Sequence, residues 1–276
     1  TLPVTADIKY LPTDSTTPLT TQTISGTVGQ VKQVTVLDPW TSAELKGQPY
    51  VFAIRNDDLM SAFSPPNLSV TLSSDTTDDK SISLQPVIAK GIFGTVKWYM
   101  DEAGTLHIGS GTFADSSGTS PWQANSSNIK NIIFEGNVTA ATDSRSLFDG
   151  LNNVVSIKGL DKLDVKNIEN AKRMFADMKS LKEIGGLSNW STGNVTNMSE
   201  MFNGASALNS LDFTNWNTSN VTNMDQMLSG MSALQKITFG SGFVTSQAIS
   251  NSVGQVDLPN DTTTIQWQSV AGGSVE

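Results

Sequence analysis

The sequence contains no cysteine, which excludes disulfides and thiolate metal sites and is compatible with export of the chain. Charged residues make up only 16% of it, and the net charge of −9 disfavours binding to nucleic-acid phosphates. No run of about 18 apolar residues is present, so no segment is expected to span a membrane. We therefore expect no nucleic-acid partner and no membrane insertion.

Residues that carry catalysis or bind metals are also scarce. The single histidine, His107, lacks the further ligands that a metal site needs, and we interpret it as an ordinary strand residue. The acidic loop 75–79 could bind calcium, but it lacks the EF-hand spacing and favours a solvated turn. Asp101 and Glu102 also lie in a predicted turn. We expect no enzyme activity, no metal and no cofactor.

One segment of the chain occurs twice. Residues 194–202 return as residues 220–228 after 26 positions, with Asn-Val-Thr-Asn-Met at the start of both copies. Four pairs of large apolar residues continue this period of 26 to 27 residues, namely Leu147-Phe148, Met174-Phe175, Met201-Phe202 and Met227-Leu228. A period of this length is typical of solenoids, in which each repeat buries its apolar face against the next.

The first half of each repeat has helical spacing. Met198, Met201 and Phe202 share one apolar face at i, i+3 and i+4, which predicts a short helix. Asn197 and Glu200 have the spacing of a capping box at the start of that helix. We therefore predict four short helices, at the apolar pairs of the four repeats.

The second half of each repeat has the strand pattern L-x-x-L-x-L. The copies are Leu208-Leu211-Phe213, Leu234-Ile237-Phe239, Leu181-Ile184-Leu187, Val154-Ile157-Leu160 and Ile129-Ile132-Phe134. The copies that begin at Leu181 and Val154 are one residue longer between the last two apolar positions. This pattern predicts an α/β leucine-rich-repeat solenoid over residues 93–245, with about five parallel strands on one face and short helices on the other.

Segments without the repeat flank the solenoid. The pattern of residues 98–109 predicts a β-hairpin with its turn at Asp-Glu-Ala-Gly. We expect this hairpin to cap the N-terminal end of the solenoid. Residues 246–276 form a predicted C-terminal cap, in which Ile265 and Trp267 indicate a closing strand. In residues 1–92, apolar and polar residues alternate at 34–36, 70–72 and 82–84, which predicts a separate small β-rich domain.

Several residue types recur in register and have a structural and a functional interpretation. Trp190 and Trp216 could stack on sugars, but a recurring aromatic more often fills the same core position in each repeat. We interpret the methionines as core and the asparagines as turn-forming residues. These residues are Met174, Met198, Met201, Met224, Met227, Asn194, Asn197, Asn220 and Asn223.

The repeat, with the segment 207–219 that follows its Asn-Val-Thr-Asn-Met motif, resembles the BspA-like leucine-rich repeats of bacterial surface proteins. The hairpin, Ser120-Pro121-Trp122 and residues 129–134 resemble the segment that precedes such repeats. The resemblance implies a wall-attached adhesin of Gram-positive bacteria, often lactobacilli and relatives. The first two repeats lack the Asn-Met signature, and the chain contains no LPxTG motif.

The N-terminal segments 6–10 and 23–30 are similar to mucin-binding modules of the MucBP type, which are small β domains found beside such repeats. The chain lacks a charged-then-apolar leader, and we interpret it as an excised piece of a longer extracellular protein. From the resemblance we expect host mucin, a matrix protein or a glycan as partner. We also expect the protein to be a monomer.

A ligand would be recognised by strand residues that point outward. These are Lys182, Glu183, Asn209, Ser210, Asp212, Gln235, Lys236 and Thr238. They form a polar set without the Trp, Tyr and Arg of strong binding hot spots, which favours weak binding and avidity from many copies. The alternative is a structural stalk that presents other domains and has no ligand of its own.

Overall fold

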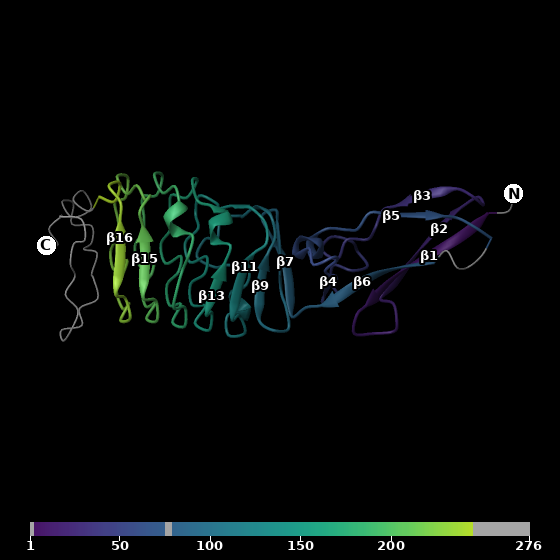
Figure 1. Ribbon diagram of the computed structural model, residues 1–276, viewed down its shortest axis with the longest axis horizontal. Helices are drawn as coiled ribbons and strands as arrows, with labels where there is room; N and C mark the ends of the chain where they lie inside the picture. The colour runs from purple at the N-terminus through teal and green to yellow at the C-terminus, as the bar shows by residue number, and fades with distance from the viewer. Residues whose placement is uncertain (1–2, 75–78, 245–276) are drawn as a thin grey trace. The chain divides into compact units, whose positions relative to one another are not determined.

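The computed structural model describes residues 3–74 and 79–244, coloured along the chain in Figure 1. These residues divide into two compact units. The N-terminal unit comprises residues up to Gly111 together with Ile133–Val138, and the solenoid unit comprises Thr112–Ile132 and the chain from Thr139 onward. The hairpin that we expected to belong to the solenoid is therefore grouped with the N-terminal unit.

The regular elements of the N-terminal unit are strands, apart from one 3₁₀ helix, and long loops connect them. Its elements are β1 (Val4–Pro12), β2 (Thr20–Gly26), β3 (Val31–Val34), β4 (Tyr50–Phe52), the 3₁₀ helix η1 (Leu59–Phe63), β5 (Leu68–Thr71), β6 (Lys80–Pro86), β7 (Ala89–Phe93), β8 (Val96–Met100) and β9 (Thr105–Ile108). Strands β10 (Gly111–Thr112), β11 (Asn131–Phe134) and β12 (Val138–Thr139) lie where the chain passes from one unit to the other.

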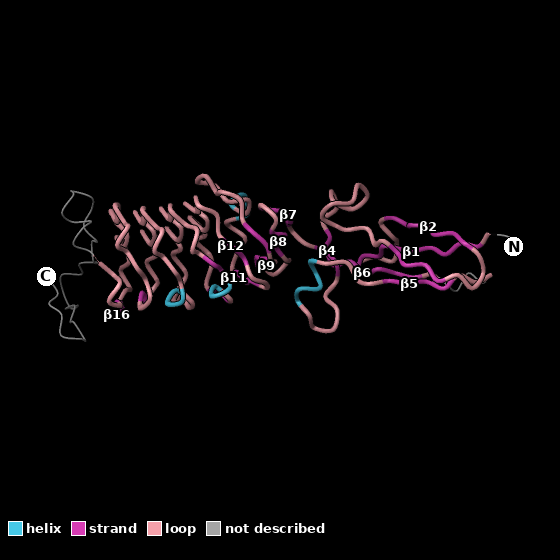
Figure 2. The backbone as a smooth tube through the Cα atoms, turned by 90° about the horizontal axis from the view of Figure 1, so that it is seen from above, coloured by secondary structure: helices cyan, strands magenta, loops and turns pink. Residues whose placement is uncertain are grey.

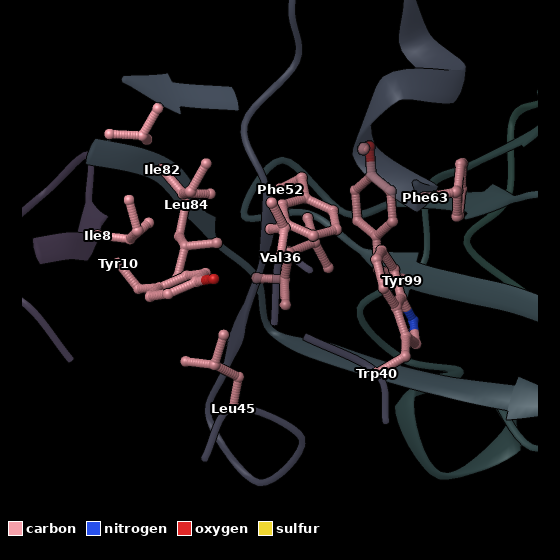
Figure 3. Close-up of a cluster of buried hydrophobic side chains, with 14 of the residues drawn as sticks. Ile8, Tyr10, Val36, Trp40, Leu45, Phe52, Phe63, Ile82, Leu84 and Tyr99 are labelled. Carbon is pink, nitrogen blue, oxygen red and sulfur yellow. The ribbon is translucent and has the colours of Figure 1, made fainter. Parts of the chain in front are cut away.

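One sheet of this unit has the order β2-β1-β6-β4, and β1 pairs antiparallel with β2 and parallel with β6. Alternation along β1 buries Ala6, Ile8 and Tyr10 on a single face, as a period of two requires. Figure 3 shows Ile8 and Tyr10 beside Leu84 in the core that they share with Phe52. Strands β3, β5 and β6 confirm the predicted β-rich character of residues 1–92.

The predicted hairpin forms from β8 and β9, which pair antiparallel from Trp98 with Ile108 to Met100 with Leu106. The backbone N–H of Gly104 donates to the Asp101 carbonyl at 3.1 Å, and Gly104 has a φ of 85°. Glycine adopts this left-handed conformation without a steric cost, which suits it to the turn. The capping role that we expected for the hairpin stays a prediction.

The solenoid unit consists of stacked coils with little regular secondary structure, drawn mostly as loops in Figure 2. Its elements are η3 (Gln123–Asn125), β13 (Ser156–Lys158), η4 (Leu160–Lys162), β14 (Leu163–Asp164), η5 (Leu187–Asn189), β15 (Ser210–Phe213) and β16 (Lys236–Phe239). Strands β15 and β16 pair in parallel and in register, from Ser210 with Lys236 to Phe213 with Phe239. The predicted solenoid is therefore confirmed for this unit.

Four of the five predicted strands form, as β11, β13, β15 and β16. The prediction is wrong for the copy from Leu181 to Leu187, whose backbone is irregular up to η5. Gly185 and Gly186 interrupt this copy, and Gly186 has a φ of 89°, which ends extended structure. Leu181 and Leu187 are nevertheless buried, so the repeat keeps its core positions there.

The predicted short helices are wrong. The residues before the four apolar pairs have φ of 55–56°, a left-handed conformation that no α-helix contains, and they are Ser146, Arg173, Glu200 and Gln226. Alternate backbone N–H groups donate to the next coil instead, for example Met198 to Asn223 and Phe202 to Met227 at 2.8 and 2.9 Å. The expected α/β mixture is therefore wrong in its helical part. Hydrogen-bonded turns take the place of the helices, and the strands lie on the other side of the coils.

The capping-box interpretation of Asn197 and Glu200 is wrong for the same reason. The Asn197 side chain accepts a hydrogen bond from the Ser199 backbone at 2.9 Å, two residues away, which is the pattern of a turn. The Glu200 backbone N–H donates to the Asp225 carbonyl at 2.8 Å. The first bond closes a turn within one repeat, and the second connects neighbouring repeats, so neither is a bond of a helix N-terminus.

A column of aromatic rings fills the coils. The Phe175 and Phe202 rings stack with centroids 5.4 Å apart, and those of Trp190 and Trp216 stack at 6.1 Å. The Trp216 indole N–H donates to the Leu187 carbonyl at 2.7 Å, which satisfies its polar atom in the core. The core interpretation of the recurring tryptophans is confirmed, because Trp190 and Trp216 are 3% and 0% exposed.

The methionine stripe is core as well, with all five side chains at most 2% exposed. The recurring asparagines bond to the backbone, as expected. The side-chain amide of Asn194 donates to the Lys166 carbonyl at 2.7 Å, and that of Asn220 donates to the Gly193 carbonyl at 2.6 Å. Asparagine therefore joins one coil to the preceding coil.

Candidate functional site

The outward side of the strands in the solenoid unit is the surface on which the predicted ligand-binding residues lie. The coils align there through backbone bonds from Val155 to Lys130, from Asn209 to Lys182 and from Gln235 to Asn209, at 2.8–3.1 Å. Parallel strands in this register stand about 4.8 Å apart. We call this surface the strand face, and strands β13, β15 and β16 mark it in Figure 1.

The structure brings the predicted ligand-binding residues together on this face. Lys182, Glu183, Asp212, Gln235 and Lys236 are exposed. In the same rows, Asn209, Ser210 and Thr238 are half-buried. The register of β15 and β16 places Ser210 beside Lys236 and Asp212 beside Thr238. Ligand binding by these residues stays a prediction.

The chemistry of the strand face is that of amides, hydroxyls and isolated charges. Asp212 accepts hydrogen bonds from the backbone and hydroxyl of Thr214, which hold its carboxylate at the end of the strand. The Ser156 hydroxyl donates to the Asn131 side chain at 2.7 Å, so neighbouring coils already form a polar row. Such a surface can hydrogen-bond a polar ligand.

The turn side of the solenoid unit has a different charge arrangement, centred on Arg173. Its guanidinium donates to Asp149 at 2.8 and 3.1 Å, to Asp177 at 2.9 Å and to Glu200 at 2.6 Å. Its pKa is raised, first by the hydrogen bonds to Asp149, and that of Glu200 is lowered by Arg173 and Lys172 against the opposing effect of burial. These ion pairs bridge three successive repeats.

Sequence reasoning missed the Arg173 network, although the repeat register contains a signal for it. Arg173 and Glu200 occupy the same position in successive repeats, 27 residues apart, and Asp177 follows Arg173 by four residues. Once the coils are stacked in register, these positions become neighbours. Because Arg173 is paired with Asp149, Asp177 and Glu200, these charges are not free to bind a ligand on the turn side.

A buried cluster in the N-terminal unit surrounds His107. The imidazole is 8% exposed, and its two nitrogens lie 2.8 Å from a Glu135 oxygen and 3.1 Å from an Asp101 oxygen. Its ring stacks on Tyr99 with centroids 4.4 Å apart. Burial lowers the pKa of His107, but the bonds to Glu135 and Asp101 outweigh this effect and raise it.

His107 is therefore a packed strand residue, as interpreted from the sequence, and its two carboxylate partners are the feature that the sequence did not reveal. Both nitrogens donate to carboxylates when the ring is charged, which favours the imidazolium form. Asp101 also accepts from the Thr105 backbone at 2.8 Å, so it closes the hairpin turn. The cluster stabilises the hairpin rather than presenting a base to solvent.

A second buried charge in the N-terminal unit is Lys90. Its ammonium donates to the carbonyls of Pro39, Leu45 and Tyr50 at 2.6, 3.3 and 2.7 Å. Burial lowers its pKa to about 8, while the charge of Asp38 opposes the shift. The three acceptors are spread over residues 39–50, so Lys90 holds this loop in place.

Of the acidic loop that could bind calcium, residues 75–78 lie outside the described residues. Asp79 accepts from the Asp7 backbone at 2.9 Å and from the Lys9 ammonium at 3.2 Å, and these bonds lower its pKa. Within residues 3–74 and 79–244, no group of three or more histidine or acidic residues is arranged to hold a metal ion. The predicted C-terminal cap, with Ile265 and Trp267, also lies outside the described residues.

In the described part of the chain, no helix has the length and hydropathy that crossing a membrane requires. Three polar features described above bear on function, namely the strand face, the Arg173 network and the His107 cluster. Of these three, the strand face is the one whose charges, including Lys182, Glu183 and Lys236, form no ion pair among the described residues.

Comparisons with known proteins bear on the repeats. A family model described as "Mycoplasma protein of unknown function, DUF285" matches residues 142–253. No curated protein matches the chain. A leucine rich cell surface protein from Faecalibacterium prausnitzii is 14% identical, with a TM-score of 0.29, over 65% of this chain and 45% of that chain.

A leucine-rich repeat protein from Eubacterium ventriosum is 16% identical, with a TM-score of 0.32, over 56% of this chain and 45% of that chain. The present chain thus spans less than half the length of either solved protein.

Proposed function

We propose that this protein is a non-enzymatic adhesin of the bacterial cell surface, which binds a host or environmental macromolecule through the strand face. One observation carries the proposal. On the turn side, Arg173, Lys172 and Lys179 form ion pairs, whereas Lys182, Glu183 and Lys236 on the strand face form none among the described residues. Charge that stands unpaired on an ordered face is available to a partner.

The resemblance to BspA-like repeats supports an extracellular location, with attachment to the wall of a Gram-positive bacterium in the full-length protein. Mucin, a matrix protein or a glycan is the partner class that this location implies. We further propose that the N-terminal unit is a MucBP-type module, and the support is its small sheet with the antiparallel pair β1–β2. We propose a monomer, with avidity arising from many copies on one cell.

The test is binding of the purified protein to arrays of glycans, mucins and matrix proteins. We expect saturable binding that is weakened when Asn209, Asp212 and Lys236 are all changed to alanine. A matched control changes Asp225 and Lys179, which are exposed on the turn side. Binding that survives the triple change, or that the control weakens equally, would place recognition elsewhere and contradict the proposal.

A second function, that of a rigid stalk, is favoured by a different observation. Inter-coil backbone bonds, stacked rings and the Arg173 network connect each repeat of the solenoid unit to the next. A stalk predicts high resistance to proteases without enrichment on any array. Binding to a defined macromolecule would reject the stalk as the whole function, and its absence from every array would reject the adhesin.

A further inference from the structure

The strand face is locally basic although the protein carries a net charge of −9. Four exposed lysines lie on it, Lys130, Lys158, Lys182 and Lys236, and we call them the lysine strip. The acidic residues on the same face are Glu183 and Asp212. Lysines of the strip therefore outnumber the carboxylates, which reverses the balance of the whole chain.

None of the four lysines forms an ion pair with any described residue. Elsewhere in the solenoid unit, by contrast, Lys166, Lys172 and Lys179 each face a carboxylate at 2.9–3.7 Å. An acidic protein has many carboxylates with which lysines could pair. Four lysines without such partners therefore leave their charge open to an external anion.

The coil register sets the spacing of the strip. Lys130 and Lys158 lie on neighbouring coils, because the Val155 backbone bonds to the Lys130 carbonyl at 2.8 Å. Lys182 and Lys236 lie two coils apart, on either side of the coil that contains Asn209. Lys158 lies three residues further along its strand than Val155. With about 4.8 Å per coil and about 3.3 Å per residue, neighbouring lysines therefore stand roughly 10–11 Å apart, close to one Debye length at physiological salt. Their potentials therefore overlap across the strand face.

We infer that the lysine strip binds an extended anionic polysaccharide, such as a sulfated or carboxylated glycan, laid across the coils. This inference rests on the proposed adhesin function and names its ligand class. Rows of amides and hydroxyls lie between the lysines, including Asn209, Ser210 and Gln235, and they suit the hydroxyl groups of sugars. The lysines supply attraction to charge, and the polar rows supply hydrogen bonds along the chain.

Two other polyanions fit the strip less well. Single-stranded nucleic acid is bound through aromatic stacking as well as charge, whereas the outward strand-face positions that the structure describes carry amides, hydroxyls, charges and the aliphatic side chains of Val155 and Ile133. Anionic membranes favour apolar insertion beside basic residues, for which the strip presents the single exposed side chain of Val155.

The experiment compares dextran sulfate with dextran, which share a backbone and differ in charge, by biolayer interferometry on the full chain. We expect binding to dextran sulfate, about tenfold or more weaker in 0.5 M than in 0.05 M NaCl, and no binding to dextran. Changing all four strip lysines to glutamine is expected to weaken binding about tenfold or more. The control changes Lys46, Lys166, Lys172 and Lys179 to glutamine, which alters net charge equally, and is expected to stay within about twofold.

Equal affinity for dextran and dextran sulfate, or equal losses in the strip and control variants, would overturn the inference. So would tighter binding to an oligothymidylate or to anionic vesicles than to dextran sulfate. If the protein ignores dextran sulfate but binds a neutral glycan or matrix protein through Asn209 and Asp212, the inference fails while the adhesin function stands. Circular dichroism spectra that superimpose on the unmodified protein confirm that the variants are folded.

Discussion

Replacing Gln226 by glycine distinguishes the observed turn from the helix that the sequence predicts. Gln226 has a φ of 55°, and a residue with a Cβ in this conformation costs about 1–2 kcal/mol. Glycine removes that cost. It also lowers the free energy of unfolding by about 0.5–1 kcal/mol, because the unfolded chain is more flexible at a glycine and loses more conformational entropy on folding. The exposed hydrogen bond from Asn203 to the Gln226 side chain, 3.3 Å long, is lost as well and is worth at most about 0.5 kcal/mol.

The balance is a stabilisation of about 0.5 kcal/mol for Gln226→Gly. In a helix the same change would destabilise by about 1 kcal/mol, so the two structures predict opposite signs. Ser146 occupies the equivalent position in the first repeat with a φ of 56°. The double variant with Ser146→Gly is expected to gain about 1 kcal/mol, because sites this far apart contribute independently.

The assay is urea unfolding followed by tryptophan fluorescence, since Trp190 and Trp216 are buried in the solenoid unit. Gln226→Ala is the control, because it keeps a Cβ and removes the same hydrogen bond. It is expected to give no stabilisation. A lower urea midpoint for Gln226→Gly than for Gln226→Ala would refute the left-handed turn.

Three other predictions follow from packing and charge. The pKa of His107 is raised in the folded state, so its contribution to stability is complete below about pH 6.5 and is lost as the pH rises through that raised pKa. The melting temperature of the unmodified protein should therefore fall over this pH range. The melting temperature of His107→Gln should not. Arg173→Ala leaves three carboxylates facing one another and should lower the urea-derived stability by about 1–2 kcal/mol, and by less in 1 M NaCl. Phe202→Ala removes a ring with 0% exposure and should cost about 3–5 kcal/mol in the same assay, and a loss below 1 kcal/mol would contradict the continuous core.

The repeat period made much of the solenoid unit predictable. A residue that recurs every 26 to 27 positions has the same surroundings in each coil, which is why Met201, Phe202 and Trp216 could be placed in the core. The same register identified the outward residues of β15 and β16, where the candidate site lies. Burial follows from periodicity alone when the units are equivalent.

Local conformation was not predictable in the same way. Met198, Met201 and Phe202 have helical spacing, and all three are buried, yet the backbone between them turns left-handed at Glu200. A helix and this turn place the same side chains on the inner face. They differ in where alternate N–H groups find acceptors, and those acceptors lie on the next coil, outside any local sequence window.

The charge clusters show the same limit. His107 meets Asp101 from its own hairpin and Glu135 from 28 residues further on, and no motif connects the three in the sequence. Arg173 gathers Asp149, Asp177 and Glu200 only because three coils stack. Which charges are paired and which remain open to a ligand is therefore a property of the packed coils.

Sequence alone was sufficient for the repeat, its buried positions and the strands of the last two coils, because equivalent positions must be buried alike. It also excluded disulfides, because the chain contains no cysteine. Tertiary structure alone decided that the inner turns are left-handed, that Arg173 is paired with carboxylates of three repeats and that the lysines of the strip are unpaired among the described residues. The reason is that hydrogen bonds and ion pairs between coils join residues about 26 positions apart, and stacking is what brings those residues within reach.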